Sequence, residues 1–178
     1  MYGDVTVKIS IIYSSNTGNT KKVAEAIKAE IEFENIVYFG NVNEEIPDAD
    51  IYIIGSWTDK GNASADIVEF IKKLKDKKIA YFGTAGYAGS AEYYRELFER
   101  VKANIDASNL VLGYFYCQGK MPVRVKERYM QMLAQNPKDE KLNMSVKNFD
   151  QALSHPDKED LKNVRQWIKN IIKSDNQE

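Results

Sequence analysis

Short runs of apolar residues, rich in β-branched side chains, alternate along the chain with longer segments whose apolar residues recur at helical spacing. The short runs predict five strands, at residues 5–13, 36–39, 51–55, 79–83 and 110–116. The third run is apolar without interruption, which is typical of a strand that is covered on both faces. A central, parallel arrangement of the strands is therefore expected.

The segments between these runs have a helical pattern. After the first strand, Val23, Ala24, Ile27 and Ile31 recur at intervals that place them on one helix face. Similar patterns follow the third and fourth strands. Because strands and helices alternate, and crossovers between parallel strands are almost always right-handed, the sequence predicts an α/β fold. We expect a doubly wound, five-stranded parallel sheet with helices on both faces.

The final third of the chain departs from this alternation. Residues 120–156 are expected to form an insertion after the fifth strand. It begins with a helix whose apolar face holds Val125, Tyr129, Met132 and Leu133. A polar stretch, 136–148, follows. The helical spacing of the methionines favours packing in the core over an exposed partner surface.

The last helix is expected to begin near Asp157, with Asp160 three residues later as a capping partner. The apolar residues on one face of this helix are expected to pack against the sheet. The insertion is too short and too polar for a second core. We therefore expect residues 1–178 to form a single domain.

Composition and charge narrow the classes of function. The chain is 43% hydrophobic and has a net charge of −1, which argues against nucleic acid as a main partner. The lysine-rich run 72–78 is interpreted as a solvated helix end rather than a docking patch. The one cysteine excludes an internal disulfide and a thiolate metal cluster, and we expect no metal site.

The cellular location of the protein is predicted from two features that the sequence does not show, a membrane span and a signal peptide. No stretch is long and apolar enough for a membrane span, and the first residues have no signal-peptide pattern. The expectation is a cytoplasmic protein.

The loop after the first strand leads directly into a helix and is rich in hydroxyl and amide groups. It consists of Ser15, Asn16, Thr17, Gly18, Asn19 and Thr20. Backbone N–H groups and hydroxyls can converge there on an oxyanion, and the helix N-terminus adds a favourable dipole. Gly18 permits the tight backbone path. The alternative is a polar loop that only caps the helix.

This loop resembles the phosphate-binding loop of flavodoxins, whose pattern is (S/T)-x-T-G-x-T. The order of elements from about residue 8 to residue 172 fits the same family. Flavodoxins are a standard example of a sheet with strand order 2-1-3-4-5 and FMN at the point where the order reverses. The resemblance therefore implies this order and an FMN cofactor. FMN is favoured over FAD because no second pyrophosphate motif is present.

The segment after the third strand is the second expected contact. It consists of Ser56, Trp57, Thr58, Asp59, Lys60 and Gly61. The resemblance implies that this loop covers the inner face of the flavin, with Trp57 stacked on the ring. The alternative for Trp57 is a place in the core.

Thr58 departs from the family pattern, which often has glycine at this position. A peptide flip into positive φ costs a β-branched residue about 1 kcal/mol or more. Strong stabilisation of the one-electron-reduced flavin is therefore less expected. If Lys60 points inward, its charge opposes a very low potential.

The third contact is expected after the fourth strand. It consists of Thr84, Ala85, Gly86 and Tyr87, with Tyr93 as a competitor for the aromatic position. The resemblance implies that the backbone of this loop binds the pyrimidine edge of the flavin. Tyr87 would cover the outer face, so the flavin would lie between Trp57 and Tyr87.

A fourth feature, the run 117–122, ends the fifth strand at the same edge of the sheet. Its Cys-Gln-Gly-Lys sequence, together with the Trp-x-Asp-Lys-Gly segment, is similar to a subgroup of bacterial flavodoxin-like proteins. Cys117 is expected to be a small buried residue rather than a redox group. His155 is expected to be a solvated loop residue and not a general base.

The resemblance implies an electron carrier that binds FMN and shuttles electrons between a reductase donor and an acceptor enzyme. Such a carrier needs no catalytic side chain. The alternative is an FMN-dependent oxidoreductase, similar to quinone reductases, with a small substrate beside the insertion. The near-zero charge and Thr58 favour it, since typical flavodoxins are strongly acidic. A third possibility is a non-redox binding protein, against which the intact loops argue. The oligomeric state is open.

Overall fold

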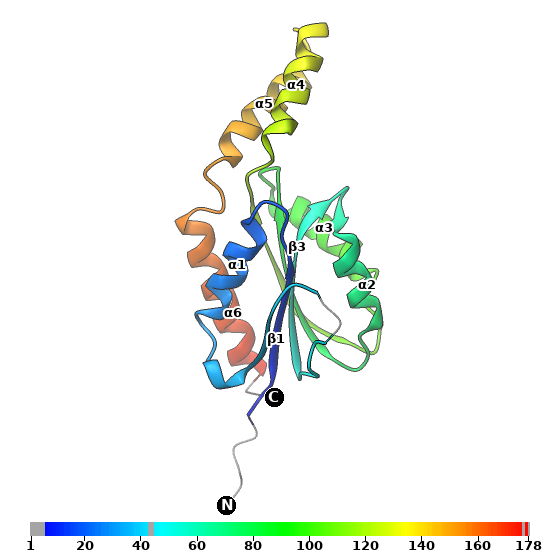
Figure 1. The fold of residues 1–178 in the computed structure, drawn as a ribbon, viewed down its shortest axis with the longest axis vertical. Coiled ribbons are helices and arrows are strands. Elements are labelled where there is room, and N and C mark those ends of the chain that lie inside the picture. Colours follow the sequence, from blue (N-terminus) through cyan, green and yellow to red (C-terminus); the bar gives the residue numbers. More distant parts are fainter. Residues whose placement is uncertain (1–5, 43–44, 176, 178) are drawn as a thin grey trace, which may run out of the picture.

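The computed structural model describes residues 6–42, 45–175 and 177, and it shows a parallel sheet between two layers of helices (Figure 1). The main strands are β1 (Ile9–Ser14), β2 (Ile36–Gly40), β3 (Ile51–Asp59), β5 (Lys78–Ala85) and β6 (Leu110–Gln118). Their order is β2-β1-β3-β5-β6, and all four neighbouring pairs are parallel. This confirms the predicted doubly wound fold and the order 2-1-3-4-5.

The helices cover both faces of this sheet. Figure 1 shows α1 (Asn19–Lys28) and α6 (Lys158–Asp175) on one face, and α2 (Ala65–Lys73) and α3 (Ala91–Lys102) on the other. A short 3₁₀ helix, Phe33–Asn35, precedes β2. Among the described residues, no helix has both the length and the apolarity that a membrane crossing needs.

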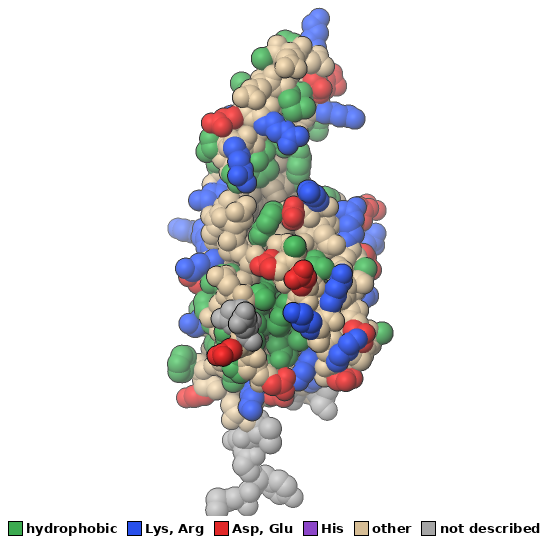
Figure 2. Space-filling view, turned by 45° about the vertical axis from the view of Figure 1, so that its right-hand side comes forward, with side chains coloured by type: hydrophobic (Ala, Val, Ile, Leu, Met, Phe, Trp, Pro, Cys, Tyr) green, Lys and Arg blue, Asp and Glu red, His purple; other side chains and the backbone are tan. Residues whose placement is uncertain are grey.

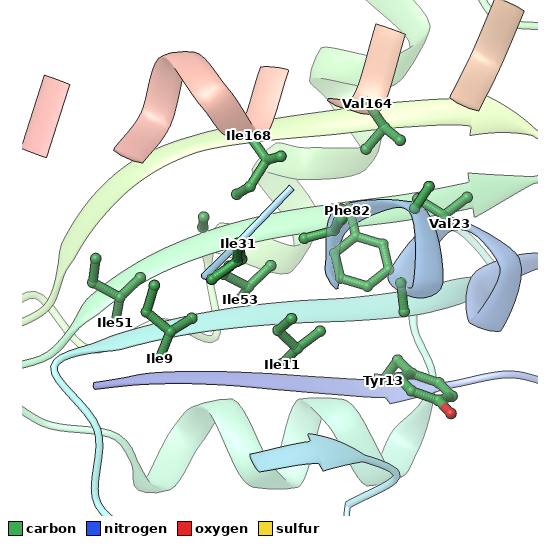
Figure 3. Packing of buried hydrophobic residues seen from close by; sticks show 14 of the residues in the cluster. Ile9, Ile11, Tyr13, Val23, Ile31, Ile51, Ile53, Phe82, Val164 and Ile168 are labelled. Atoms are coloured by element: carbon green, nitrogen blue, oxygen red, sulfur yellow. The ribbon is translucent and has the colours of Figure 1, made fainter. Parts of the chain in front are cut away.

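Alternate residues of each central strand enter different halves of the core. In β3, Ile53 faces α1 and α6, whereas Ile54 faces α2 and α3, and both are fully buried. Figure 3 shows the first half, where Phe82 of β5 lies near Val23 of α1 and Val164 of α6. Since successive strand side chains point to opposite faces, a strand covered twice must be apolar at every position. This explains the uninterrupted run from residue 51.

The first strand begins later, and the third ends later, than predicted. β1 starts at Ile9; Val5, where the prediction began, lies outside the described residues. β3 continues to Asp59 and pairs with the antiparallel strand β4 (Asn62–Ala63). The prediction of an irregular loop at residues 56–61 is therefore wrong.

A two-residue turn causes this difference. Lys60 and Gly61 connect β3 to β4 with φ values of 48° and 81°. Positive φ at both central residues is the turn geometry that matches the twist of a tight hairpin. Glycine adopts it without strain, and hence the strand folds back instead of opening into a loop.

The insertion is a helical hairpin. α4 (Val123–Gln135) and α5 (Glu140–Ala152) pack on one another and extend beyond the carboxyl edge of the sheet (Figure 1). The stretch 136–148, polar as the sequence indicates, is helical from Glu140, which the sequence pattern did not predict. The Asp139 carboxylate accepts a hydrogen bond from the Leu142 N–H at 3.0 Å and caps this helix.

The predicted cap of the last helix is confirmed. The Asp157 carboxylate accepts hydrogen bonds from the N–H groups of Glu159 and Asp160, each at 2.9 Å. Asp160 in turn accepts from the Asp157 N–H at 2.9 Å. The N–H of Asp160 is the main reason why the pKa of Asp157 is lowered. His155, however, is half-buried, and its Nδ1 lies 2.6 Å from Asp160 Oδ2, so the prediction of a solvated histidine is wrong.

The lysine-rich run lies where the prediction placed it. α2 ends at Lys73, and the later lysines turn to acidic groups of neighbouring segments. Lys77 pairs with Asp48 at 2.6 Å, and Lys78 with Asp175 at 2.5 Å. The second half of the run is therefore neutralised within the molecule, whereas Lys72 and Lys73 are exposed at the end of α2.

Candidate functional site

A cavity of about 430 Å³ opens at the carboxyl edge of the sheet, between the ends of β1, β3 and β5 and the start of α4. Most of the residues predicted to bind a cofactor line it. They are Asn16, Thr17, Asn19, Trp57, Thr58, Lys60, Gly61, Thr84, Ala85, Gly86, Tyr87 and Tyr93. Three segments far apart in the sequence therefore meet at one site, as expected where parallel strands end together.

The remaining predicted residues support the wall of the cavity without lining it; they are Ser15, Gly18, Thr20, Ser56 and Asp59. The buried hydroxyl of Thr20 lies 3.0 Å from that of Thr84 and joins the first segment to the third. The buried Ser56 hydroxyl lies 3.0 Å from that of Ser64. These bonds fix the ends of the strands that carry the site.

The first segment leaves the N-terminus of α1 open. Gly18 is the N-cap, with φ of 88°, and as a glycine it offers no side chain to cap the helix. No other heavy atom lies within 4 Å of where a Gly18 Cβ would stand. The Ser15 hydroxyl accepts a hydrogen bond from the Lys21 N–H at 3.2 Å and keeps its own proton to donate. This end of the helix is thus suited to an oxyanion.

The second segment is held rigidly by the β3–β4 hairpin. Thr58 pairs with Ala63, and its hydroxyl donates to the Thr84 carbonyl at 2.9 Å. Positive φ occurs at Lys60 and Gly61, not at Thr58. The peptide after Trp57 is therefore held in a strand, and a flip there would break both the ladder and the Thr58 bond.

The aromatic side chains near the cavity differ in how far they are exposed to solvent. Trp57 and Tyr93 are half-buried, whereas Tyr87 is 44% exposed. Tyr94 turns to the core: its ring stacks on Tyr116 at 5.4 Å, and its hydroxyl accepts from the Gly89 N–H at 3.2 Å. Burial raises the pKa of Tyr94 to about 12.

Tyr87 is positioned by the helical hairpin. Its hydroxyl lies 3.1 Å from the Ser145 hydroxyl and 3.4 Å from that of Tyr129. Burial, together with the hydrogen bond to Tyr87, raises the pKa of Tyr129 to about 12. The exposed ring of Tyr87 is thus tethered at its far end.

Part of the cavity wall was absent from the predicted cofactor contacts. The end of β6 and the start of α4 contribute Gly119, Lys120, Met121, Pro122, Arg124 and Val125. The Lys120 carbonyl accepts from Asn19 Nδ2 at 2.8 Å and from Thr17 Oγ1 at 3.5 Å, and it joins this wall to the first segment. The signal in the sequence was the run 117–122 at the carboxyl end of a strand.

The charges around the cavity are of one sign. Lys60, Lys120 and Arg124 line it, and no carboxylate of the described residues does. Three cations beside one cavity make its electrostatic potential more positive and favour an anionic ligand. They also favour any ligand state that gains negative charge.

Two other groups of chemically versatile side chains lie outside the cavity lining. Cys117 is buried, as predicted, and burial raises the pKa of its thiol, which keeps the thiol protonated. His155, Asp157 and Asp160 place ligand-type atoms within 4.8 Å of one another. Both carboxylates, however, accept the N–H bonds that begin α6, and so the cluster acts as a helix cap.

Comparison with known proteins identifies the class. Residues 10–169 match the family described as Flavodoxin domain. The chain therefore belongs to the flavodoxin family, which binds FMN.

Individual relatives support this assignment. A flavodoxin-like domain-containing protein BilS of Clostridium symbiosum is 37% identical over 172 residues, which cover 87% of this chain and 90% of that protein. The protein of the same name from Clostridioides difficile is 33% identical, with coverage of 93% and 97%. The flavodoxin of Clostridium beijerinckii is 35% identical over 104 residues, which cover 52% of this chain and 75% of that protein.

Solved structures agree on the fold. A short-chain flavodoxin associated with a non-canonical PDU bacterial microcompartment superposes with a TM-score of 0.56 at 14% identity. The superposition covers 94% of this chain and 98% of that flavodoxin. The flavodoxin of Streptococcus pneumoniae TIGR4 gives 0.55 at 15% identity, with coverage of 93% and 98%. At these identities the likeness concerns the fold alone.

Proposed function

We propose that this protein binds FMN in the cavity and carries electrons from a reductase donor to an acceptor enzyme. The observation that carries this proposal is the meeting, at one cavity, of the open N-terminus of α1 with Trp57 and Tyr87. FMN has both features to match, a phosphate and a flat aromatic ring. When bound, it supplies one- and two-electron redox chemistry.

The residues present fit this cofactor. The phosphate would lie at Thr17, Gly18 and the first N–H groups of α1, where the helix dipole and the hydroxyl proton of Ser15 favour an anion. The ring would lie between Trp57 and Tyr87, and the backbone of Gly86 would contact its polar edge. Lys120 and Arg124 would add favourable charge. Among the described residues that line the cavity, no two side chains form a pair typical of general acid–base catalysis, and an electron carrier needs none.

A second candidate, an FMN-dependent oxidoreductase similar to quinone reductases, is favoured by two specific observations. Thr58 is held in the β3–β4 ladder, so the peptide that would respond to one-electron reduction is not free to flip. The three cations at the cavity favour the charge gained on full reduction. Both features favour two-electron transfer to a small substrate over one-electron shuttling.

The family assignment also supports proposals about the domain organisation, cellular location and partners of the protein. We propose that residues 1–178 act as one flavodoxin-like domain, with the α4–α5 hairpin as its insertion, and that the protein works in the cytoplasm. The partners would be redox proteins, in keeping with electron transfer between proteins in this family.

The first experiment is a titration of the apoprotein with FMN and, separately, with riboflavin, read by quenching of flavin fluorescence. We expect FMN to bind at least ~100-fold more tightly, because only FMN places a phosphate at the α1 N-terminus. No binding of either flavin would refute the proposal and favour a non-redox role. Equal affinities for FMN and riboflavin would show that the α1 N-terminus does not bind the phosphate, and this part of the proposal would fail.

The loaded protein then distinguishes the two candidates in an anaerobic reductive titration. Accumulation of a half-reduced flavin, seen as long-wavelength absorbance midway, would support the electron carrier. A direct passage from yellow to colourless, together with rapid NADH or NADPH oxidation by an added quinone, would support the oxidoreductase.

A further inference from the structure

The α4–α5 hairpin, residues 123–152, stands outside the two core clusters of the sheet. No residue of α4 is buried, and in α5 only Phe149 and Ala152 are. The chain leaves and returns at one point, where the Lys120 N–H donates to the His155 carbonyl at 3.0 Å. A pair of helices that contributes so little to the core is placed to contact something else.

The base of the hairpin is attached to the cavity. Arg124 and Val125 line the cavity, and Tyr129 and Ser145 bond to Tyr87. The hairpin then extends away from the sheet at the carboxyl edge (Figure 1). A protein that binds the side of the hairpin where Lys141, Met144 and Lys147 adjoin Tyr87 would consequently lie next to the cavity.

The hairpin carries a charge opposite to that of the remaining chain. It has six Lys and Arg against four Asp and Glu, a net charge of +2, whereas the rest has 19 against 22, a net charge of −3. Lys126 and Asp150 pair at 2.6 Å within the hairpin. Five exposed basic side chains have no ion pair among the described residues: Arg124, Arg128, Lys138, Lys141 and Lys147.

Large apolar side chains lie between these charges. Met144 is 69% exposed, Val123 65% and Met130 51%. The prediction that the methionines of the insertion pack in the core is therefore wrong. Figure 2 shows Lys and Arg interspersed with hydrophobic side chains over the hairpin. Flexible, polarisable methionine suits a surface that adapts to a partner.

We propose that the α4–α5 hairpin is the docking surface for a redox partner protein whose contact surface is acidic with an apolar centre. This proposal rests on the proposed function, because the partner would exchange electrons with FMN in the cavity. Unpaired surface cations steer an acidic protein to the hairpin, and the exposed methionines bury apolar area once contact is made. The attachment to Tyr87 brings that partner to the cavity.

The test uses two haem proteins of opposite charge, the acidic cytochrome b5 and the basic cytochrome c, as electron acceptors. The FMN-loaded protein is photoreduced and mixed with each acceptor in a stopped-flow instrument. The hairpin variant is Arg128→Glu, Lys141→Glu and Lys147→Glu, none of which lines the cavity. The matched control reverses the charge of three exposed lysines at the ends of α2 and α3. Its substitutions are Lys72→Glu, Lys73→Glu and Lys102→Glu.

We expect electron transfer to cytochrome b5 to be fast at low salt, to slow as salt is added, and to fall by ~10-fold or more in the hairpin variant. The control variant should change the rate by less than ~3-fold, and transfer to cytochrome c should rise in the hairpin variant. Equal effects of the hairpin and control variants on cytochrome b5 would overturn the proposal. FMN absorbance should be the same in all three proteins.

A binding measurement without flavin separates this proposal from the proposed function. Titration calorimetry with cytochrome b5 at low salt should show binding by the apoprotein that the hairpin variant loses. If the protein rejects FMN but binds in this way, only the proposed function fails. If it binds phosphatidylserine vesicles or a second copy of itself through the hairpin, and cytochrome b5 binding does not depend on the hairpin, the docking proposal fails.

Discussion

At the scale of single residues, Tyr94 connects the core to the loop that carries Tyr87. Its ring stacks on Tyr116, and its hydroxyl is the acceptor for the Gly89 N–H. Burial holds the pKa of Tyr94 at about 12, above the ordinary value of 10.0. The folded state therefore keeps this proton longer than the unfolded chain does. The resulting contribution to stability is complete below pH 10 and is lost as the pH rises toward 12.

Tyr94→Phe is expected to lower the free energy of unfolding at pH 7 by about 1 kcal/mol, because the Gly89 N–H loses its acceptor. The difference from the wild type should narrow above pH 10, since the variant has no proton to lose there. Urea unfolding at pH 7 to 11 measures both effects, with Tyr114→Phe as the control for loss of a hydroxyl. A difference that stays constant with pH would contradict the assignment.

At the scale of elements, α5 contacts the loop that carries Tyr87 through Ser145 and, with more hydrogen bonds, through Asn148. The Asn148 amide donates to the Gly86 carbonyl at 2.9 Å and accepts from the Ala88 N–H at 3.1 Å. It also accepts from Gln118 Nε2 at 3.2 Å, which joins α5 to the end of β6. One amide thus fixes both sides of the loop that carries Tyr87.

Asn148→Ala is expected to weaken FMN binding by ~5- to 20-fold, the equivalent of one or two lost hydrogen bonds that order the loop. The matched control is Asn143→Ala on the same helix, whose amide bonds to the Asp139 carbonyl within the hairpin. Fluorescence titration with FMN gives both affinities. Equal affinities in the two variants would mean that α5 does not order the loop.

At the scale of the whole molecule, the core of the sheet and the hairpin are separate. The core clusters contain residues of the strands and of α1, α2, α3 and α6, and none of α4 or α5. The hairpin contributes contacts to the site and exposed charge to the surface. Folding of the sheet should accordingly depend little on the hairpin.

Replacement of residues 123–153 by Gly-Ser-Gly is expected to leave a cooperatively folding sheet, because residues 120 and 155 already meet through a backbone hydrogen bond. The thermal midpoint should fall by only a few degrees, which corresponds to the loss of local contacts rather than of a core. Circular dichroism melts of the two chains measure this. Loss of the cooperative transition would show that the hairpin belongs to the folding unit.

The positions of several elements could be predicted because their signals are local. Helix periodicity located α1 through Val23 and Ile27, and the Asp157–Asp160 pair located the start of α6. Other elements depend on partners that periodicity does not identify. β4 exists because the Lys60–Gly61 turn returns the chain onto β3, and α5 is a polar helix that needs α4 as its neighbour.

The sequence by itself determined the alternation of the five main strands with their helices and the hydroxyl-rich loop before α1, because periodicity and loop composition are properties of neighbouring residues. Only the tertiary structure decided the far wall of the cavity, where Lys120 and Arg124 join the lining and the Lys120 carbonyl accepts a hydrogen bond from Asn19, 101 residues earlier in the chain. It also decided that Met130 and Met144 stay exposed. An apolar helix face is buried only if another element covers it, and that depends on where the chain folds back.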